Sequence, residues 1–466
     1  MNQDELRHWS KRAADWAADY HAGLRDRPVR ASVRPGDVAA RLPARAPEEP
    51  EPMEAIFADF EALVPDAMAH WQHPRFFAYF PAAAAPASML AEQLANAMAA
   101  QCMLWQTSPA ATEIEQVMVR WLRDALGLAG HFTGTIHDAA TTATFCAVLT
   151  MRERALGWTG LTQGLAGQAR PRIYASDQTH SSIDKAVRMA GIGQENLMKL
   201  PVRADLGMDP DALARAVAAD RDAGHLPAGV VVCVGGTSVG AIDPVREVLE
   251  VARAEGLYTH VDAAWAGSAM ICPEFRALWD GVDLADSIVF NPHKWLGAQF
   301  DCAVQFLSDP GPQIRTMGLR PDYLQTPGAE EITNFNEWTV PLGRRFRALK
   351  LWFLLRAEGL EGLRARIRDH VAWSRELAGR LQDDPRFEIV TASPLSLLSF
   401  RLTGDDADAR TEALLERVND DGRIYLTLTR HAGRPVIRVA VGGWATTHAD
   451  VLAVHDVLGE LAGSDD

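Results

Sequence analysis

The sequence lacks the features that mark nucleic-acid-binding, membrane and secreted proteins. A net charge of −15 leaves no basic excess, which argues against binding to nucleic acid or to anionic membranes. No apolar run approaches the roughly 18 residues of a membrane span, and the N-terminus has no basic start or apolar core of a signal peptide. The five cysteines have no metal-ligand or redox spacing, and an odd number suits a reduced compartment. We therefore expect a cytoplasmic protein that binds neither nucleic acid nor membranes.

Internal repeats are also missing, as are the glycine motifs of Walker and dinucleotide-binding loops. What is present is an ordinary globular composition, 48% hydrophobic and 23% charged. The 466 residues are enough for two or three domains with a large core.

The N-terminal part is predicted to be helical. Residues 28–54 are rich in Pro, Arg and Glu and indicate an extended connector, and residues 55–130 look mostly helical. The first helix carries a stripe at three- and four-residue steps, formed by Leu6, Trp9, Ala13, Trp16 and Tyr20. This stripe could pack on the rest of its own chain or on a partner subunit.

From about residue 140 the pattern alternates between strands and helices. The strand segments are PRIYASD, AGVVVCVGG, LYTHVDA, DSIVFN and CAVQFLS. Such alternation predicts a mainly parallel sheet with helices on both faces. After a long helical stretch over 343–381, the segments RFEIV, LSLLSFRL and VIRVAVGG predict a smaller α+β domain.

Polar residues follow several of the predicted strands. The stretch FNPHKWLGAQFD ends a strand and places Lys294 directly behind it, although an isolated lysine usually just faces water. Asp262 ends another strand, His180 follows a third, and Thr141 opens a helix. In an open parallel sheet, ligands bind beyond the carboxyl ends of the strands.

One cofactor chemistry uses all four side chains. A lysine amine can bind an aldehyde cofactor covalently, and a carboxylate can hold a pyridine nitrogen protonated. A histidine can stack over the ring, and a helix N-terminus with a threonine can bind a phosphate. We therefore expect pyridoxal 5′-phosphate as the cofactor.

Five stretches carry a resemblance to a known family: HPRFFAYFP, SDQTHSSIDKA, HVDAAWAGSAMICPEFR, FNPHKWLGAQFDC and PLGRRFRALKLWF. Over about residues 60–360 the chain resembles the aromatic-L-amino-acid decarboxylases, group II of the pyridoxal-phosphate decarboxylases. The resemblance implies an α/β fold of the aspartate-aminotransferase type (fold type I) with a mainly parallel seven-stranded sheet. It also implies an obligate homodimer with shared active sites. The expected division is an N-terminal helical dimerisation segment (1–84), a large cofactor domain (85–352) and a small C-terminal α+β domain (353–466).

The resemblance also implies roles for single residues. Lys294 would hold the cofactor, Asp262 would contact the pyridine nitrogen, His180 would stack on the ring, and Tyr323 would belong to a mobile catalytic loop. Further cofactor contacts would come from Ala140, Thr141, Thr237, Ala264, Asn291 and His293, and from Leu342 and Gly343 of the other subunit. The substrate side chain would meet Trp71, Tyr79, Phe80, Pro81 and Ala82, and, across the interface, Gln101 and Met103. No metal site is expected.

The implied reaction is decarboxylation of an aromatic L-amino acid of the Trp, Phe, Tyr or DOPA type to an amine and carbon dioxide. Two positions depart from the family: Ala139 replaces a serine before the phosphate helix, and Ala82 replaces the threonine of catechol-binding members. Three alternatives remain open, namely an aromatic aldehyde synthase, a decarboxylase of a non-aromatic amino acid, and a non-catalytic cofactor-binding protein. Tyr323 and His180 argue against the synthase. A glutamate decarboxylase would need a cation near the pocket, where Arg75 is the nearby candidate, and we expect Arg75 to face solvent or pair with an acid.

Overall fold

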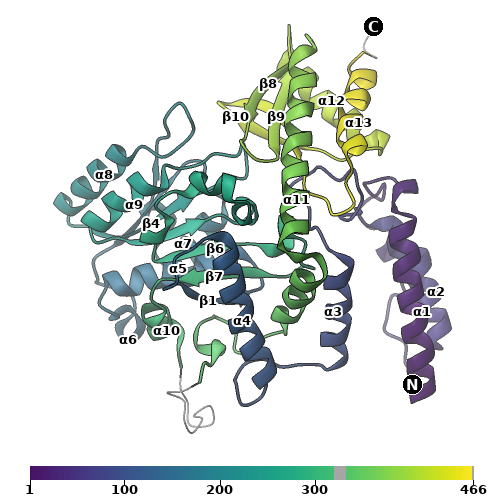
Figure 1. Ribbon diagram of the computed structural model, residues 1–466, viewed down its shortest axis with the longest axis horizontal. Coiled ribbons are helices and arrows are strands. Elements are labelled where there is room, and N and C mark those ends of the chain that lie inside the picture. The colour runs from purple at the N-terminus through teal and green to yellow at the C-terminus, as the bar shows by residue number, and fades with distance from the viewer. Residues whose placement is uncertain (320–331, 464–466) are drawn as a thin grey trace. The chain divides into compact units, whose positions relative to one another are not determined.

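The structure, a computed structural model, describes residues 1–319 and 332–463. The described chain, drawn in Figure 1, divides into two compact units. The larger unit comprises Ala82–Ala372 and Thr391–Leu398. The smaller unit comprises Met1–Pro81, Trp373–Val390 and Ser399–Asp466. Tyr323 lies outside the described residues.

A seven-stranded sheet forms the centre of the larger unit. Its strands are β1 (Thr133–His137), β2 (Pro171–Ser176), β3 (Leu197–Leu200), β4 (Leu226–Cys233), β5 (Tyr258–Asp262), β6 (Ser287–Phe290) and β7 (Ala303–Leu307). The order is β1-β7-β6-β5-β4-β2-β3. Only β7 runs antiparallel to its neighbours β1 and β6, and the other pairs are parallel. The predicted mainly parallel sheet is thus confirmed.

Helices cover both faces of this sheet. The helices of the larger unit are α3 (Pro86–Ala97), α4 (Pro109–Leu126), α5 (Ala140–Ala155), α6 (Gly160–Gln163), α7 (Ser182–Met189), α8 (Pro210–Asp222), α9 (Val245–Ala254), α10 (Gly311–Met317) and the first part of α11 (Arg347–Asp383). On β2, Ile173 and Ala175 pack into a core cluster with residues of α5 and α7. Tyr174 between them donates to Oδ2 of Asp220 on α8 at 2.7 Å. Successive side chains of a strand point to opposite faces, so α5 and α8 cover different faces.

Local sequence signals explain where several elements begin and end. At the start of α8, the side chain of Asp209 accepts from the backbone N–H of Asp211, and Pro210 fills the first helical position. At the end of α4, Gly127 adopts a left-handed φ of 76° that a glycine tolerates best. Every residue of strands β5 and β6 is buried, as expected for strands covered on both faces, and the polar side chain of His260 on β5 is hydrogen-bonded to the hydroxyl of Ser287 at 2.9 Å.

The smaller unit combines helices with a four-stranded sheet. Its elements are α1 (Gln3–Ala22), α2 (Met53–Leu63), the end of α11, β8 (Phe387–Ala392), β9 (Leu397–Leu402), α12 (Ala407–Asp421), β10 (Thr427–His431), β11 (Arg434–Ala440) and α13 (His448–Ala462). The strand order is β10-β11-β9-β8, and the tip of the β8–β9 hairpin groups with the larger unit. The three predicted strands are present, whereas sequence reasoning missed β10.

The aromatic stripe of α1 contacts α2 of the same chain. The rings of Trp9 and Phe57 lie 5.5 Å apart, and those of Trp16 and Phe60 lie 4.8 Å apart. Of the two possibilities left open by the sequence, the stripe therefore packs on its own chain at these positions.

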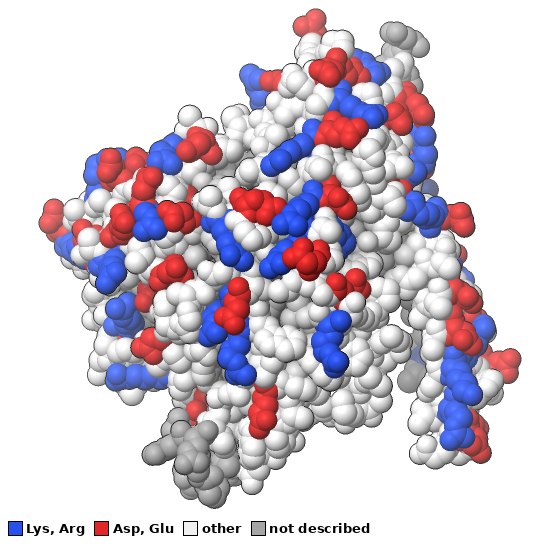
Figure 2. Space-filling view, in the orientation of Figure 1, with Lys and Arg blue, Asp and Glu red and all other residues white. Residues whose placement is uncertain are grey.

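Charged residues of both signs share the surface. On the face that Figure 2 shows, basic and acidic side chains are interspersed. Many are ion-paired, as in Arg246–Asp280 at 2.7 Å and Arg368–Glu274 at 2.6 Å. None of the described helices is long and apolar enough to cross a membrane.

Candidate active site

A cavity of about 270 Å³ lies where β4, β5 and β6 end and α5 begins. Nine residues predicted from the sequence line it: Ala140, Thr141, His180, Thr237, Asp262, Ala264, Asn291, His293 and Lys294. Six further lining residues were not predicted as site residues: Ala139, Ser182, Cys233, Gly235, Gly236 and Trp265. Sequence reasoning concentrated on charged and hydroxyl side chains, and most of these six contribute backbone or apolar surface instead.

Lys294 sits on a tightly anchored turn. The chain leaves β6 at Phe290 and forms a π-helical turn over Pro292–Leu296. The backbone N–H of Lys294 donates to the carbonyl of Asn291 at 2.9 Å, and its carbonyl accepts from Ala83 at 3.2 Å. The next residue, Trp295, is 1% exposed, so it fixes the turn in the core. The backbone of the lysine is therefore held while its partly buried side chain lines the cavity.

Asp262 is the last residue of β5, and only 7% of its surface is exposed. Its Oδ1 accepts from the backbone N–H of Ala264 at 3.1 Å, and its carbonyl accepts from Val234 at 2.9 Å. One carboxylate oxygen is thereby oriented by the backbone. A carboxylate fixed in this way can hold a proton on a ring nitrogen placed against it.

His180 lies at the mouth of the cavity and is exposed. Its Nδ1 accepts from the backbone N–H of Ser182 at 3.1 Å, which leaves the ring proton on Nε2. Desolvation lowers the pKa of His180; Asp262 raises this pKa and Lys294 lowers it further. The ring is therefore biased toward its neutral form, which suits a group that stacks on a flat ligand.

The N-terminus of α5 supplies donors for an anion. Ala140 and Thr141 open the helix, and the first N–H groups of a helix have no acceptor within it. Asn291 is 3% exposed, and its Oδ1 has no hydrogen-bond partner among the described residues. A side chain at Gly235 (φ 82°) would place its Cβ 2.5 Å from Cβ of Ala266. The cavity thus has an amine, a carboxylate, an anion-binding helix end and an unsatisfied amide, which together fit pyridoxal 5′-phosphate.

Leu342 and Gly343 do not line this cavity; they form an exposed turn. Next to that turn lies Gln101, whose Oε1 accepts from the backbone N–H of Arg344 at 2.8 Å. A Cβ at Gly343 would lie 2.8 Å from Nε2 of Gln101. Met103 follows two residues later and is partly buried. The structure therefore brings Gln101 to the turn of Leu342 and Gly343, and all of these residues were predicted to serve the neighbouring subunit.

The predicted aromatic substrate residues gather in the smaller unit. The rings of Trp71 and Tyr79 stack with centroids 5.7 Å apart, and Trp71 is 38% exposed. Tyr79 has a left-handed φ of 50°, which is uncommon for a bulky residue and indicates a conformation imposed by its surroundings. Phe80 and Pro81 are buried, while Ala82 belongs to the larger unit.

Two arginines of the smaller unit lie near these aromatic residues, Arg75 in the sequence and Arg438 in space. Arg75 is paired with an acid, as expected, since its Nε lies 3.1 Å from Oδ1 of Asp450. Sequence reasoning missed a second cation, Arg438 on β11, which is 4% exposed and lies 5.2 Å from the ring centre of Phe80. Burial lowers the pKa of Arg438 to about 10. A β-strand arginine 358 residues after Phe80 has no local signal that would reveal this contact.

Comparisons with known proteins identify relatives over almost the whole chain. A family model described as the pyridoxal-dependent decarboxylase conserved domain matches residues 35–403. Aromatic-L-amino-acid decarboxylase of Sus scrofa is 40% identical over 95% of this chain and 93% of its own length. Phenylacetaldehyde synthase of Arabidopsis thaliana is 34% identical over 99% of this chain and 96% of its own length.

One solved structure is also similar over nearly the whole length of both chains. It is described as Oryza sativa TDC with PLP and tryptamine, and it superposes with a TM-score of 0.96 at 36% sequence identity. The match covers 99% of this chain and 98% of that one.

Proposed function

Because this chain belongs to the pyridoxal-dependent decarboxylase family, we propose that its cavity holds pyridoxal 5′-phosphate on Lys294 for the decarboxylation of an aromatic L-amino acid. The chain is an amino-acid decarboxylase, a carboxy-lyase that uses pyridoxal phosphate and acts on an aromatic amino acid. The assignment of roles to its residues is our proposal. Its main support is that nine residues selected from the sequence line one cavity.

In this proposal the protein holds the cofactor by three groups. The amine of Lys294 would bind the aldehyde carbon, Asp262 would contact the pyridine nitrogen, and the N-terminus of α5 with Thr141 would bind the phosphate. Asn291, Thr237 and Ala264 would complete the contacts. The fixed orientation of the Asp262 carboxylate supports this arrangement, since a mobile acid would hold the ring proton poorly.

When bound, pyridoxal phosphate supplies an electron sink for the pair released when the bond between Cα and the carboxylate breaks. Asp262 would keep a proton on the ring nitrogen and thereby stabilise the charge that develops. His180 would stack on the ring and shield that face from water. Tyr323 would then deliver a proton to Cα, so that the products are an amine and carbon dioxide. An aldehyde-forming reaction would need this proton transfer to fail, and the tyrosine at 323 argues against that outcome.

The aromatic residues around Trp71 and Tyr79 support an aromatic side chain in the substrate. Stacked and edge-on contacts suit a flat ring, whereas a carboxylate or ammonium side chain would lose hydration there without a partner. The relatives named for aromatic amino acids and their products agree with this chemistry. Ala82 offers no hydroxyl to a catechol, which favours indole and phenyl side chains.

We further propose that the enzyme is a cytoplasmic homodimer. Leu342, Gly343, Gln101 and Met103 would complete the site of the neighbouring subunit, and the exposure of the first three, with Gln101 bonded to the residue after Gly343, supports this role. The three-part division at residues 1–84, 85–352 and 353–466 belongs to the same proposal. We expect no binding to nucleic acid or membranes.

The test is an assay of purified, cofactor-loaded protein against a panel of amino acids, with carbon dioxide, amine and aldehyde all measured. The proposal predicts amine and carbon dioxide in equal amounts from aromatic amino acids. Release of carbon dioxide only from glutamate or a diamino acid, or an aldehyde as the main product, would contradict it.

A further inference from the structure

His293 differs from the other polar residues of the cavity because a neighbouring backbone segment holds its ring. The backbone N–H of Cys302 donates to Nδ1 of His293 at 2.8 Å, and the N–H of His293 donates back to the carbonyl of Cys302 at 3.3 Å. His293 is 5% exposed, and the ring of Phe300 lies 4.8 Å from its own. An Nδ1 that accepts a hydrogen bond cannot carry the proton of a neutral ring, so this proton must lie on Nε2.

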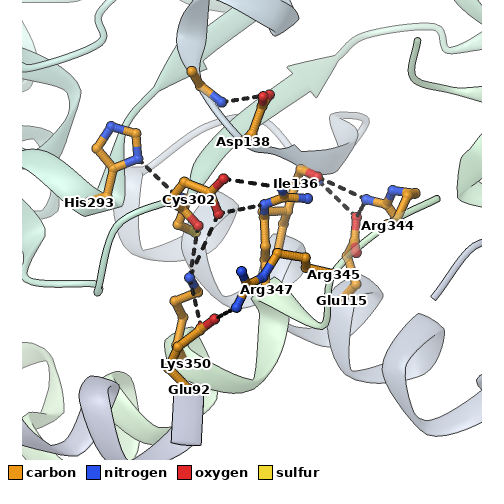
Figure 3. A network of polar contacts seen from close by, with 12 residues as sticks. Glu92, Glu115, Ile136, Asp138, His293, Cys302, Arg344, Arg345, Arg347 and Lys350 are labelled. Carbon is orange, nitrogen blue, oxygen red and sulfur yellow. Dashed lines mark hydrogen bonds and ion pairs between the residues drawn. The ribbon is translucent and has the colours of Figure 1, made fainter. Parts of the chain in front are cut away.

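The segment that presents the Cys302 amide is fixed by ion pairs of the preceding residue. Asp301 accepts from Nε of Arg347 at 3.0 Å through Oδ1 and from a terminal nitrogen of the same arginine at 3.2 Å through Oδ2. Its carbonyl accepts from Nζ of Lys350 at 2.9 Å, and Lys350 is also paired with Glu92 at 2.9 Å. We call Asp301, Arg347, Lys350 and Glu92 the Asp301 cluster, of which Arg347, Lys350 and Glu92 are labelled in Figure 3.

This cluster is poorly accessible to water. Lys350 is 1% exposed, and the side chains of Arg347, Glu92 and Asp301 are 12%, 16% and 23% exposed. Charged groups buried in this way stay in one arrangement, because breaking a pair would leave an uncompensated charge. Oγ of Ser88 accepts from the N–H of Gln299 at 2.7 Å and holds the start of the same segment. The position of the Cys302 amide is therefore set from two sides.

The charges that face His293 also oppose its protonation. Burial lowers the pKa of His293 to about 3; Lys294 lowers it as well, Asp301 raises it, and Lys350 lowers it. Lys294 comes from the same turn, Asp301 from the fixed segment, and Lys350 from α11. The net effect of these groups agrees with the geometry of the Cys302 hydrogen bond, which also requires an unprotonated Nδ1.

We infer that the Asp301 cluster holds His293 as a neutral imidazole with its proton on Nε2, so that the ring is a fixed hydrogen-bond donor to an anionic group in the cavity. His293 then donates a hydrogen bond without transferring its proton. Asp301 is a positioning residue that acts through the Cys302 amide. The identity of the anion, a cofactor phosphate or a substrate carboxylate, rests on the proposed function. The protonation state of the His293 ring does not rest on the proposed function.

The ring state can be measured in the full-length protein labelled with ¹⁵N-histidine, with and without pyridoxal 5′-phosphate. The nitrogen signals of His293 are those that His293→Gln removes. We expect one protonated nitrogen, Nε2, and no titration between about pH 5.5 and pH 8.5. A proton on Nδ1, or a midpoint near the usual value of about 6.5, would overturn the inference without touching the proposed reaction.

Substitutions at position 293 test the donor. Glutamine can present an N–H at the place of Nε2, asparagine presents one nearer the place of Nδ1, and leucine presents none. We expect His293→Gln to keep the affected binding constant within about threefold, and His293→Asn and His293→Leu to weaken it about tenfold or more. If the anion is phosphate, the dissociation constant for pyridoxal 5′-phosphate rises and that for pyridoxal does not. If it is the substrate carboxylate, only KM of the loaded enzyme rises. No change in any of these constants for His293→Leu would refute the donor role.

The positioning role is tested at Asp301 itself. Asp301→Ala should give His293 a second tautomer in the ¹⁵N spectrum, whereas Asp301→Asn, which keeps an acceptor for Arg347, should largely preserve the native spectrum. Asp280→Ala is the matched control, since it also removes a carboxylate paired with an arginine but lies outside the cluster. If Asp301→Ala does not fold, Arg347→Gln loosens the same segment. A native His293 spectrum in whichever of these two variants folds would show that Asp301 does not position the ring.

Discussion

Arg344 and Glu115 form a buried ion pair directly beside the turn of Leu342 and Gly343. Their side chains are 3% and 4% exposed, and the two charged groups lie 2.6 Å apart (Figure 3). Oε1 of Glu115 also accepts from the hydroxyl of Thr135 at 2.9 Å and from the N–H of Ile136 at 2.8 Å. The pair therefore connects the exposed turn to strand β1 of the central sheet.

Removing the carboxylate of this pair should lower the free energy of unfolding. Glu115→Ala leaves the Arg344 guanidinium buried without its counter-charge, and we expect a loss of about 3 kcal/mol or more in the free energy of unfolding. Glu115→Gln, which keeps an acceptor oxygen, should lose less. Urea unfolding at fixed protein and cofactor concentrations measures the difference. Asp280→Ala breaks an exposed pair and serves as the control; if it shifted the midpoint as much as Glu115→Ala, the burial argument would fail.

Acid should destabilise the fold partly through His260. This residue is fully buried between the hydroxyls of Ser287 and Thr144, and burial lowers its pKa to about 4, while Asp262 raises it. The unfolded chain binds the proton below about pH 6.5, so the stability contribution of the neutral ring is lost as pH falls from about 6.5 to 4. His260→Gln should make the pH dependence of unfolding shallower by about 1.4 kcal/mol per pH unit in that range. The exposed His131→Gln is the control and should keep the native slope.

Much of the fold follows from local patterns in the sequence. The strands that end in Asp262 and before Asn291 are short buried segments, and the common location of their polar ends is predictable because parallel strands present their carboxyl ends at one edge. Strand β10 was missed because its sequence, TLTRH, has one apolar residue, Leu428, which is exposed, so the strand has no apolar period to recognise. The antiparallel place of β7 is set by pairing with β1, more than 160 residues away, and no local signal specifies it.

The site was predictable where chemistry requires a particular side chain. Lys294, Asp262 and Thr141 could be selected for this reason. Gly235 and Trp265 contribute backbone space and apolar surface, which many sequences could supply. Two other features depend on tertiary packing, namely the contact of Arg438 with Phe80 and the support of His293 by the segment of Asp301. No regular spacing in the sequence indicates either of them.

Lys294 should carry the cofactor. Reduction with borohydride followed by peptide mapping should place the pyridoxyl group on this residue, and Lys294→Ala should lose turnover and bind the cofactor weakly. Lys199→Ala is the matched control, because that lysine pairs with Asp184 outside the cavity. A label found mainly on another lysine would refute the assignment.

Tyr323 should decide between amine and aldehyde. Tyr323→Phe removes the hydroxyl that we propose as proton donor to Cα, so protonation of Cα would slow, oxygen would compete with it, and the product would shift toward the aldehyde. Amine, aldehyde and oxygen consumption should be measured together, with His180→Asn as a comparison. An unchanged amine yield in Tyr323→Phe would mean that another group, such as His180, donates the proton.

The side chain of the substrate should be aromatic, and the reason lies in which cations are available. A glutamate side chain needs an unengaged positive partner, and the cation that the sequence suggested, Arg75, shares the carboxylate of Asp450 with Arg25, at 3.1 and 2.7 Å. We therefore expect tryptophan, phenylalanine or tyrosine to exceed glutamate in kcat/KM by at least about a hundredfold, or about 3 kcal/mol of transition-state binding.

Arg438 is the cation that could contradict this expectation, because it lies against Phe80 and its terminal nitrogen is 3.5 Å from the carbonyl of Tyr79. If it only supports this aromatic segment, Arg438→Lys and Arg438→Gln should lower kcat/KM for tryptophan and for glutamate by similar factors. If it recognises an acidic side chain, Arg438→Gln should selectively abolish activity on glutamate. A native enzyme that prefers glutamate, and loses that preference in Arg438→Gln, would show that this buried arginine and not the aromatic rings sets the specificity. We expect the first outcome, since the cation is already engaged with the ring of Phe80.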